Sequence, residues 1–531
     1  MPQLRQLSIS PALLALGALP LAFIGAMCVA PVLRLLAEGG AGYHSSGAAA
    51  LWQDGYLRGR LVWSVLQALA SSIAVLVLGL PVAWVLARFN FAGRALVLRL
   101  LMLPFVMPAL VASLGALALW GPQGLSMRWL GIDLQDTPWL LVYGNVFFNL
   151  CLLVRAGVDG FAHVNASQMA AARTLGASPW RTFWRVEWPA VQPWVTSAMC
   201  LVFLYCFSGF GIALILGGQD YATLEVEIYS LVAHELKLAE AGMLAIVAMT
   251  ITTTAALLYT VRESRLANPM RADAVPLRQP SGIVQWAMVC AAKLILTICC
   301  ASPMLALAAR VLEAGTSVWA VLLEEDTLDA LWNTLRFSAM ATCLATLLGL
   351  THALAAQRST LLRAAALLPF VVSPVTMAFG LLLLYPEWSA SLEMLIVAYA
   401  LLAYPLVAKS ITSALDSLPE HLLHAARSLG ASPWRCFWRI TFPLIAPALR
   451  RGMAFAAATA LGEFAVSLFL SRPEWTTLTT LIYQRLGRPG ANSLNEAIVL
   501  ASLLVALALL TFVALEYGTQ DKLQSQEPID A

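Results

Sequence analysis

Long apolar stretches separated by short polar loops run through the whole chain. A helix needs about 20 apolar residues to cross a bilayer, and a polar segment at 263–282 divides the stretches of that length into two sets of six. They lie near 11–36, 58–87, 95–120, 137–160, 191–217 and 238–261, and near 283–311, 327–356, 361–385, 391–414, 446–470 and 494–516. The pattern predicts an all-α, polytopic membrane protein with about twelve transmembrane helices.

One polar, arginine-bearing segment occurs twice among these stretches. Ala171–Pro189 reads AARTLGASPWRTFWRVEWP and Ala425–Pro443 reads AARSLGASPWRCFWRITFP; over twenty positions fourteen are identical, at an offset of 254 residues. Duplication and fusion is the simplest explanation. We therefore expect one half at 1–262, a linker at 263–282 and a second half at 283–531, with a pseudo-symmetry axis along the bilayer normal.

Each repeat is expected to form two short helices with a corner between them. A glycine can adopt the left-handed conformation that ends the first helix. A serine and a proline then supply the N-cap and first turn of the second helix, and a later proline marks where that helix should stop or bend. These residues are Gly176, Ser178, Pro179 and Pro189 in the first repeat and Gly430, Ser432, Pro433 and Pro443 in the second.

The composition agrees with a membrane protein. Hydrophobic residues make up 60% of the chain, charged residues only 11%, and the mean hydropathy is +0.78. None of the nine Cys forms a CxxC pair, the six His show no HExxH spacing, and no GxxxxGK[ST] loop occurs. We expect no metal site, no cofactor and no enzyme activity in this chain, so any ATP hydrolysis must come from another subunit.

The basic residues predict the orientation. Arginines gather in the linker and in the loops that contain the two repeats, whereas the loop at 313–329 carries four acidic residues after Glu313 and no Lys or Arg. The positive-inside rule places both termini and both repeats in the cytosol. The first apolar stretch lacks a clear cleavage site, so we expect it to be retained as a helix.

The repeats resemble the signature loop of membrane subunits of ATP-binding-cassette importers, in which Glu-Ala-Ala is followed by three residues, Gly, nine residues and Ile-x-Leu-Pro. Ala170 and His424 stand where the Glu would be. The resemblance implies that the loops at 165–190 and 419–444 dock on ATPase subunits. The residues implied in this coupling are Ala171, Ala172, Gly176 and Ala177, with Ala425, Ala426, Gly430 and Ala431. The alternative is a pair of interfacial helices without a partner.

The resemblance covers nearly the whole chain and implies a fused permease of the bacterial inner membrane. Its implied partners are two cytosolic ATP-binding subunits, a periplasmic substrate-binding protein, membrane lipid and a small solute, with no nucleic acid. A secondary transporter with parallel repeats is the rival interpretation, but the similarity between the halves here is highest in the loops. A membrane-embedded enzyme is a third possibility, and no motif supports it.

Within this class the chain is similar to thiamine permeases, with thiamine or its phosphates as the implied solute and ferric-iron permeases as the alternative. The segments that carry the similarity are Leu51–Leu57, Val146–Leu150, Val186–Pro189, Leu216–Gly218 and Ala222–Tyr229. Thiamine is an organic cation, so an acidic group and aromatic rings would suit its path. The candidates are Glu463, Phe464 and Trp120. An ionisable group within a span faces a cavity or a partner, so Glu463 could equally be a packing or gating residue.

Overall fold

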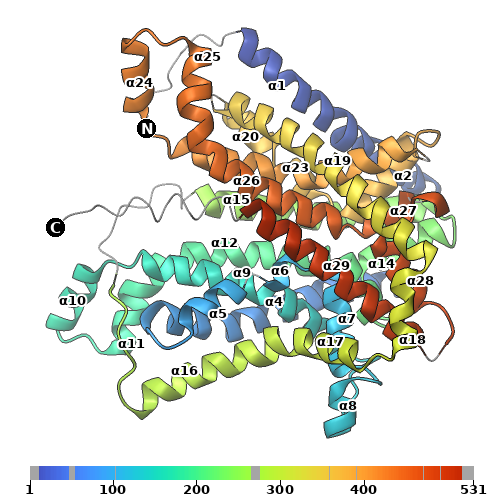
Figure 1. Cartoon of the computed structure of the whole chain (residues 1–531), viewed down its shortest axis with the longest axis horizontal. Coiled ribbons are helices and arrows are strands. Elements are labelled where there is room, and N and C mark those ends of the chain that lie inside the picture. Colours follow the sequence, from blue (N-terminus) through green and yellow to red (C-terminus); the bar gives the residue numbers. More distant parts are fainter. Residues whose placement is uncertain are drawn as a thin grey trace. The chain divides into compact units, whose positions relative to one another are not determined.

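The structure is a computed structural model that describes residues 11–46, 54–101, 103–264, 275–357, 359–389, 391–470, 472–490 and 492–516 (Figure 1). Within these ranges the chain is helical and contains no strand; one isolated bridge joins Phe89 and Arg278. The all-α prediction is confirmed. The chain ends, residues 51–53 of the first thiamine-like segment and residues 265–274 of the expected linker lie outside the described residues.

The chain forms two compact units. The first-half unit comprises residues 38–320 and 485–502, and the second-half unit comprises 1–37, 321–484 and 503–531. Each unit therefore includes the first apolar stretch of the other half. The halves expected from the repeat describe the duplication, whereas the compact units follow from which helices pack together.

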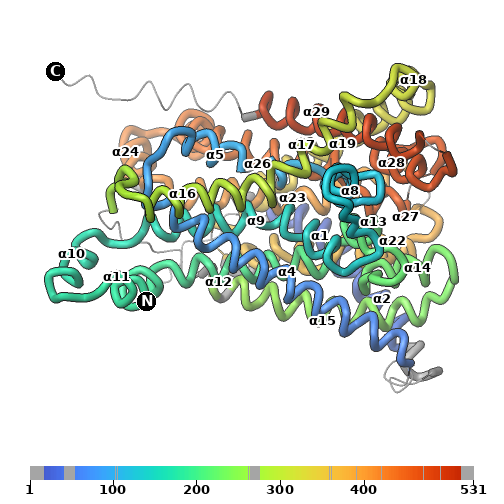
Figure 2. Tube along the Cα trace, turned by 90° about the horizontal axis from the view of Figure 1, so that it is seen from below, coloured from blue at the N-terminus to red at the C-terminus, as the bar shows by residue number. Residues whose placement is uncertain are grey.

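The first-half unit is built around four long helices, α4, α9, α12 and α15, which run alongside one another (Figure 2). Its helices are α4 (Gly55–Arg88), α5 (Arg94–Leu100), α6 (Leu103–Val106), α7 (Ala109–Trp120), α8 (Leu125–Leu130), α9 (Pro138–Ala162), α10 (Ala166–Thr174), α11 (Pro179–Thr182), η2 (Phe183–Glu187), α12 (Trp188–Phe207), α13 (Phe210–Leu216), α14 (Leu224–Ala233), α15 (Leu238–Ser264), α16 (Ile283–Leu296), η3 (Thr297–Ala301), α17 (Ser302–Glu313) and α18 (Thr316–Trp319).

The second-half unit has α19, α23 and α26 at its centre. The helices that begin in it are α1 (Pro11–Ile24), η1 (Gly25–Val29), α2 (Ala30–Ser46), α19 (Glu325–Ala356), α20 (Thr360–Ala365), α21 (Leu368–Val371), α22 (Pro374–Leu384), α23 (Leu392–Asp416), α24 (Glu420–Ser428), α25 (Pro433–Cys436), η5 (Phe437–Thr441), α26 (Phe442–Leu461), α27 (Ala465–Leu470), η6 (Pro473–Trp475) and α28 (Leu478–Leu486). The last helix is α29 (Ser493–Glu516). Helices α9, α10 and α12 have the same bounds as α23, α24 and α26 at the offset of 254, so residues at this offset can be compared directly.

The exchanged first helices pack in the same way in both units. A Cβ atom at Gly115 of α7 would lie 3.1 Å from the carbonyl oxygen of Pro303 in α17, and one at Gly380 of α22 would lie 3.1 Å from that of Pro31 in α2. Small residues let helix backbones approach closely inside a membrane. Each unit thus uses a glycine opposite a proline to seat a helix from the other half of the sequence.

Ten helices within the described ranges are long and apolar enough to span a membrane. Two of the twelve expected spans are not among them. The stretch at 361–385 breaks before Pro374, which leaves α22 with 11 residues. The stretch at 446–470 carries Arg450 and Arg451, which lower its hydropathy, and it breaks after Leu461. Prolines lie at the breaks in the stretches near 95–120 and 361–385: Pro108 directly precedes α7, and Pro374 begins α22.

Candidate functional site

The corner in each repeat has the predicted geometry. Gly176 and Gly430 have φ angles of 77° and 79°. In the first repeat, the backbone N–H groups of Gly176 and Ala177 donate to the carbonyl groups of Arg173 and Ala172, respectively, both at 3.0 Å. The second repeat makes the same two bonds at the same lengths. These two hydrogen bonds satisfy carbonyl groups that the end of the helix leaves without partners.

The second helix of each repeat begins as expected but does not stop at the proline. The Ser178 and Ser432 hydroxyl groups accept hydrogen bonds from the N–H groups three residues later, both at 3.3 Å. A π-helical turn follows, and the chain continues through Pro189 and Pro443 directly into α12 and α26. A π-helical turn is a local irregularity that occurs where the regular i→i−4 hydrogen bonds of a helix are interrupted. The proline therefore marks a change of helix type.

Apolar side chains project from both corners. Leu175 is 87% exposed and Leu429 is 88% exposed, and Trp180 and Trp434 are 71% and 70% exposed. The predicted coupling residues also have the same burial at equivalent positions of the two repeats. Ala171, Gly176, Ala425 and Gly430 are exposed, and Ala172, Ala177, Ala426 and Ala431 are half-buried. Two sets of matching exposed apolar residues are typical of surfaces that contact another protein.

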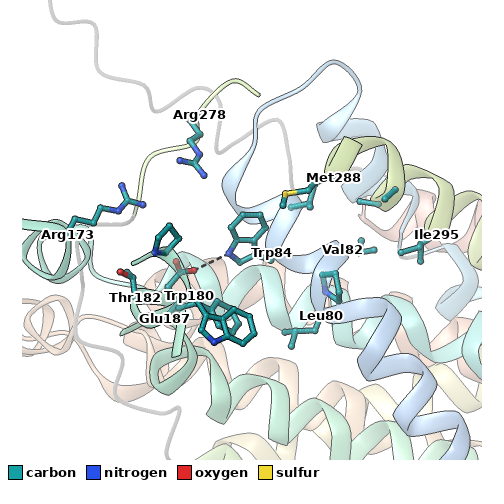
Figure 3. Close-up of a pocket in the computed structure, with 16 residues that line it drawn as sticks. Leu80, Val82, Trp84, Arg173, Trp180, Thr182, Glu187, Arg278, Met288 and Ile295 are labelled. Carbon is teal, nitrogen blue, oxygen red and sulfur yellow. Dashed lines mark hydrogen bonds between the residues drawn. The ribbon is translucent and has the colours of Figure 1, made fainter. Parts of the chain in front are cut away.

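A buried ion pair anchors the first repeat to α4. The Arg88 guanidinium lies 2.9 Å from the Glu187 carboxylate, and both side chains are buried. The Trp84 indole N–H donates to the same carboxylate oxygen at 3.2 Å, as Figure 3 shows. The Arg88 guanidinium also lies over the Phe161 ring at 5.6 Å. Buried charges need such partners, because an unpaired buried charge is very costly.

An apolar cavity of about 560 Å³ lies beside this anchor. Side chains of α4 and α16 and of the repeat form its walls, and Arg173 and Arg278 lie on one side of it (Figure 3). Arg278 also lies over the Phe89 ring at 5.1 Å. Beside the Arg88–Glu187 pair, part of the repeat is therefore separated from α4 and α16 by this cavity.

The second repeat has no counterpart of Glu187, because Thr441 occupies the equivalent position. The ion pair nearby in sequence is the one between Arg363 and Asp416, at 2.7 Å, with both side chains more than a third exposed. Sequence reasoning missed the Arg88–Glu187 anchor. Its signal was the single acidic residue in a repeat whose copy carries a neutral one.

Glu463 lies at the break between α26 and α27 and acts as a helix cap. Its carboxylate accepts the backbone N–H of Val466 at 3.1 Å, while its carbonyl accepts the hydroxyl groups of Ser467 at 2.9 Å and Thr479 at 3.0 Å. The Tyr399 hydroxyl bonds to that of Ser467. Glu463 thus lies in a polar cluster at a helix break, which is the environment expected of a packing residue.

The two aromatic candidates have packing partners. The Phe464 ring is buried and lies 5.4 Å from that of Tyr483, and the equivalent pair in the first half, Phe210 and Tyr229, lies at 5.5 Å. Trp120 ends α7 in the first-half unit, where its ring meets Tyr143 edge-on at 5.7 Å. Their role in a solute path stays a prediction.

Comparisons with known proteins agree with the repeat. Residues 75–267 and 330–523 each match the family model described as binding-protein-dependent transport system inner membrane component. The chain is 26% identical to a thiamine transport system permease protein from Escherichia coli over 487 residues, covering 88% of this chain and 90% of that protein. It is 27% identical to one from Brucella suis, covering 93% and 94%. A sulfate transport system permease protein from Synechocystis is 33% identical over 31% of this chain and 61% of its own length.

We predict that the Arg88–Glu187 pair holds the first repeat in place. Glu187→Thr, which introduces the residue of the second repeat, would leave Arg88 buried without its carboxylate and should destabilise the protein by about 3–5 kcal/mol. The measurement is the free energy of unfolding of each variant in mixed detergent micelles. Arg88→Leu with Glu187→Leu should recover most of the loss, and Arg363→Leu, which breaks the exposed pair, should cost less than about 1 kcal/mol. Equal losses from both single variants would contradict the anchor.

Proposed function

Because the chain belongs to the family of binding-protein-dependent transport system inner membrane components, we propose that it imports thiamine with the help of partner ATPase subunits. The two family matches make it a fused two-half permease of an ATP-binding-cassette importer, a multi-pass protein of the inner membrane. ATP hydrolysis then belongs to a separate subunit.

The matched corners are the observation that supports coupling best. The chain has two copies of one backbone geometry, each with an exposed leucine directly before the glycine, and these would serve as two equivalent docking points. Two copies of one ATPase subunit could bind them in the same way, one to each repeat. A periplasmic binding protein would deliver the solute from the opposite side.

The substrate proposal depends on full-length similarity. The thiamine permeases match about nine-tenths of both chains, whereas the sulfate permease matches only a part. The Glu463 carboxylate would attract the permanent charge of thiamine in a low-dielectric environment, and the aromatic candidates would add weak contacts. A ferric-iron solute is the alternative.

The proposed orientation has both termini and both repeats in the cytosol. Reporter fusions that end after Ser281, before α16, should be active only with a cytosolic reporter such as a fluorescent protein. Fusions that end after Gly315, between α17 and α18, should be active only with a periplasmic one such as alkaline phosphatase. The physical reason is the excess of arginine on the first of these sides. The opposite pattern would reverse the topology.

The coupling proposal predicts that the corners are needed together. A valine at position 176 or 430 would have to adopt a positive φ angle, at a cost of about 1–3 kcal/mol, although no atom lies within 4 Å of the added Cβ. Gly176→Val with Gly430→Val should lower substrate-stimulated ATP hydrolysis of the reconstituted complex about tenfold. Gly59→Val, in a helical position with equally open space, is the control. Unchanged stimulation in the double variant would refute the docking role.

The substrate proposal predicts a specific response at Glu463. Glu463→Gln keeps an oxygen that can accept the Val466 N–H but removes the charge, so thiamine uptake into vesicles should fall about fivefold, as expected for about 1 kcal/mol. Glu463→Ala removes both features and should fall further. Full uptake with Gln would leave only the capping role. A deletion strain with normal thiamine uptake and poor iron accumulation would favour the ferric-iron alternative.

A further inference from the structure

A cavity of about 520 Å³ lies between α23 and α26 in the second-half unit, separate from the repeats and from Glu463. Three serines, two basic side chains and one aromatic ring are prominent in its wall: Ser410, Ser413, Ser417, Lys409, Arg451 and Phe455. None of the described residues that line it carries a carboxylate. Asp416, at the end of α23, is held by Arg363 through two bonds of 2.7 and 2.8 Å.

The first half shows what this position looks like when it is filled. At the offset of 254, Ser417 corresponds to His163 and Ala448 corresponds to Trp194. The His163 and Trp194 rings stack with their centroids 4.9 Å apart. The tryptophan and the histidine therefore occupy the region that is open between the equivalent helices of the second half.

A second difference fits the first. A Cβ atom at Gly160 would lie 3.0 Å from the Trp194 side chain, so the tryptophan needs a glycine opposite it. The second half has Ala414 in place of that glycine and Ala448 in place of the tryptophan. The two changes are sterically consistent, and together they leave the cavity.

The charges differ in the same region. In the first half, Arg155 and Asp159 form an ion pair at 3.3 Å, and Ser197 is neutral. The second half has Lys409 and Ser413 at the positions of that pair and Arg451 at the position of Ser197. Across these three positions, one cation, one anion and one hydroxyl group in the first half correspond to two cations and one hydroxyl group in the second half.

We propose that this cavity binds a phosphate group, presented either by a soluble anion or by the headgroup of an anionic lipid. Arg and Lys pair with phosphate oxygens, and serine hydroxyl groups add neutral hydrogen bonds. Basic pockets between transmembrane helices suit anionic headgroups. The cavity would repel free thiamine, and the argument for it rests on its lining and on the comparison of the two halves, whichever solute the chain transports. Because α23 and α26 flank the second repeat, an occupant would connect the two helices that hold it.

The test is binding to the purified full-length chain in detergent. Calorimetry with inorganic phosphate and pyrophosphate probes a soluble ligand, and native mass spectrometry with phosphatidylglycerol against phosphatidylcholine probes a headgroup. Arg451→Ser, which introduces the first-half residue, should weaken binding about tenfold, the equivalent of one charge-assisted hydrogen bond. Ala414→Gly with Ala448→Trp should fill the cavity and abolish binding. Arg450→Ser removes the same charge from a residue that does not line the cavity and is the control.

Each result decides the matter. Binding of pyrophosphate that is lost in both variants supports a soluble ligand, and selective retention of phosphatidylglycerol that is lost in both supports a lipid headgroup. If the unmodified chain binds neither probe, or if Arg450→Ser weakens binding as much as Arg451→Ser, the proposal is wrong.

Discussion

A backbone N–H or carbonyl group without a hydrogen bond is costly inside a bilayer, so this structure depends on how its helices are capped where they break. The N–H of Leu224, at the start of α14, donates to the Ser64 hydroxyl at 2.7 Å, and that of Leu478, at the start of α28, donates to the Thr334 hydroxyl at 2.8 Å. Each hydroxyl group also donates to a carbonyl of its own helix. A side chain from a continuous helix thus caps a broken one in both halves.

The features that the sequence predicts are those coded locally. The left-handed glycine and the serine cap of each repeat depend on residues within one turn, and both occur where expected. The offset of 254 also predicted which helices would correspond. The breaks at Pro108 and Pro374 also have a local cause, because proline lacks a backbone N–H group.

The features that it does not predict depend on contacts between distant residues. Arg88 and Glu187 are 99 residues apart, and only packing brings them together. Hydropathy likewise cannot show on which unit the first helix of each half packs. An apolar helix has the same composition whichever unit it joins. Gly115 and Gly380 contact Pro303 and Pro31 only because each unit contains the first helix of the other half. The position of Glu463 within a span was predictable, whereas its bond to Val466 was not.

The two halves differ at several positions in their helices, whereas the exposed corners of their repeats match. Asn145 corresponds to Tyr399, Gly209 to Glu463 and Glu187 to Thr441, while the exposed side chains of the repeats agree to within about a hundredth of their area. Two copies of one ATPase subunit would need two equal surfaces, and any change in one repeat alone would weaken one contact of the pair. If two copies of one subunit bind the repeats, equal exposed loops beside unequal buried residues are therefore the expected outcome of the duplication.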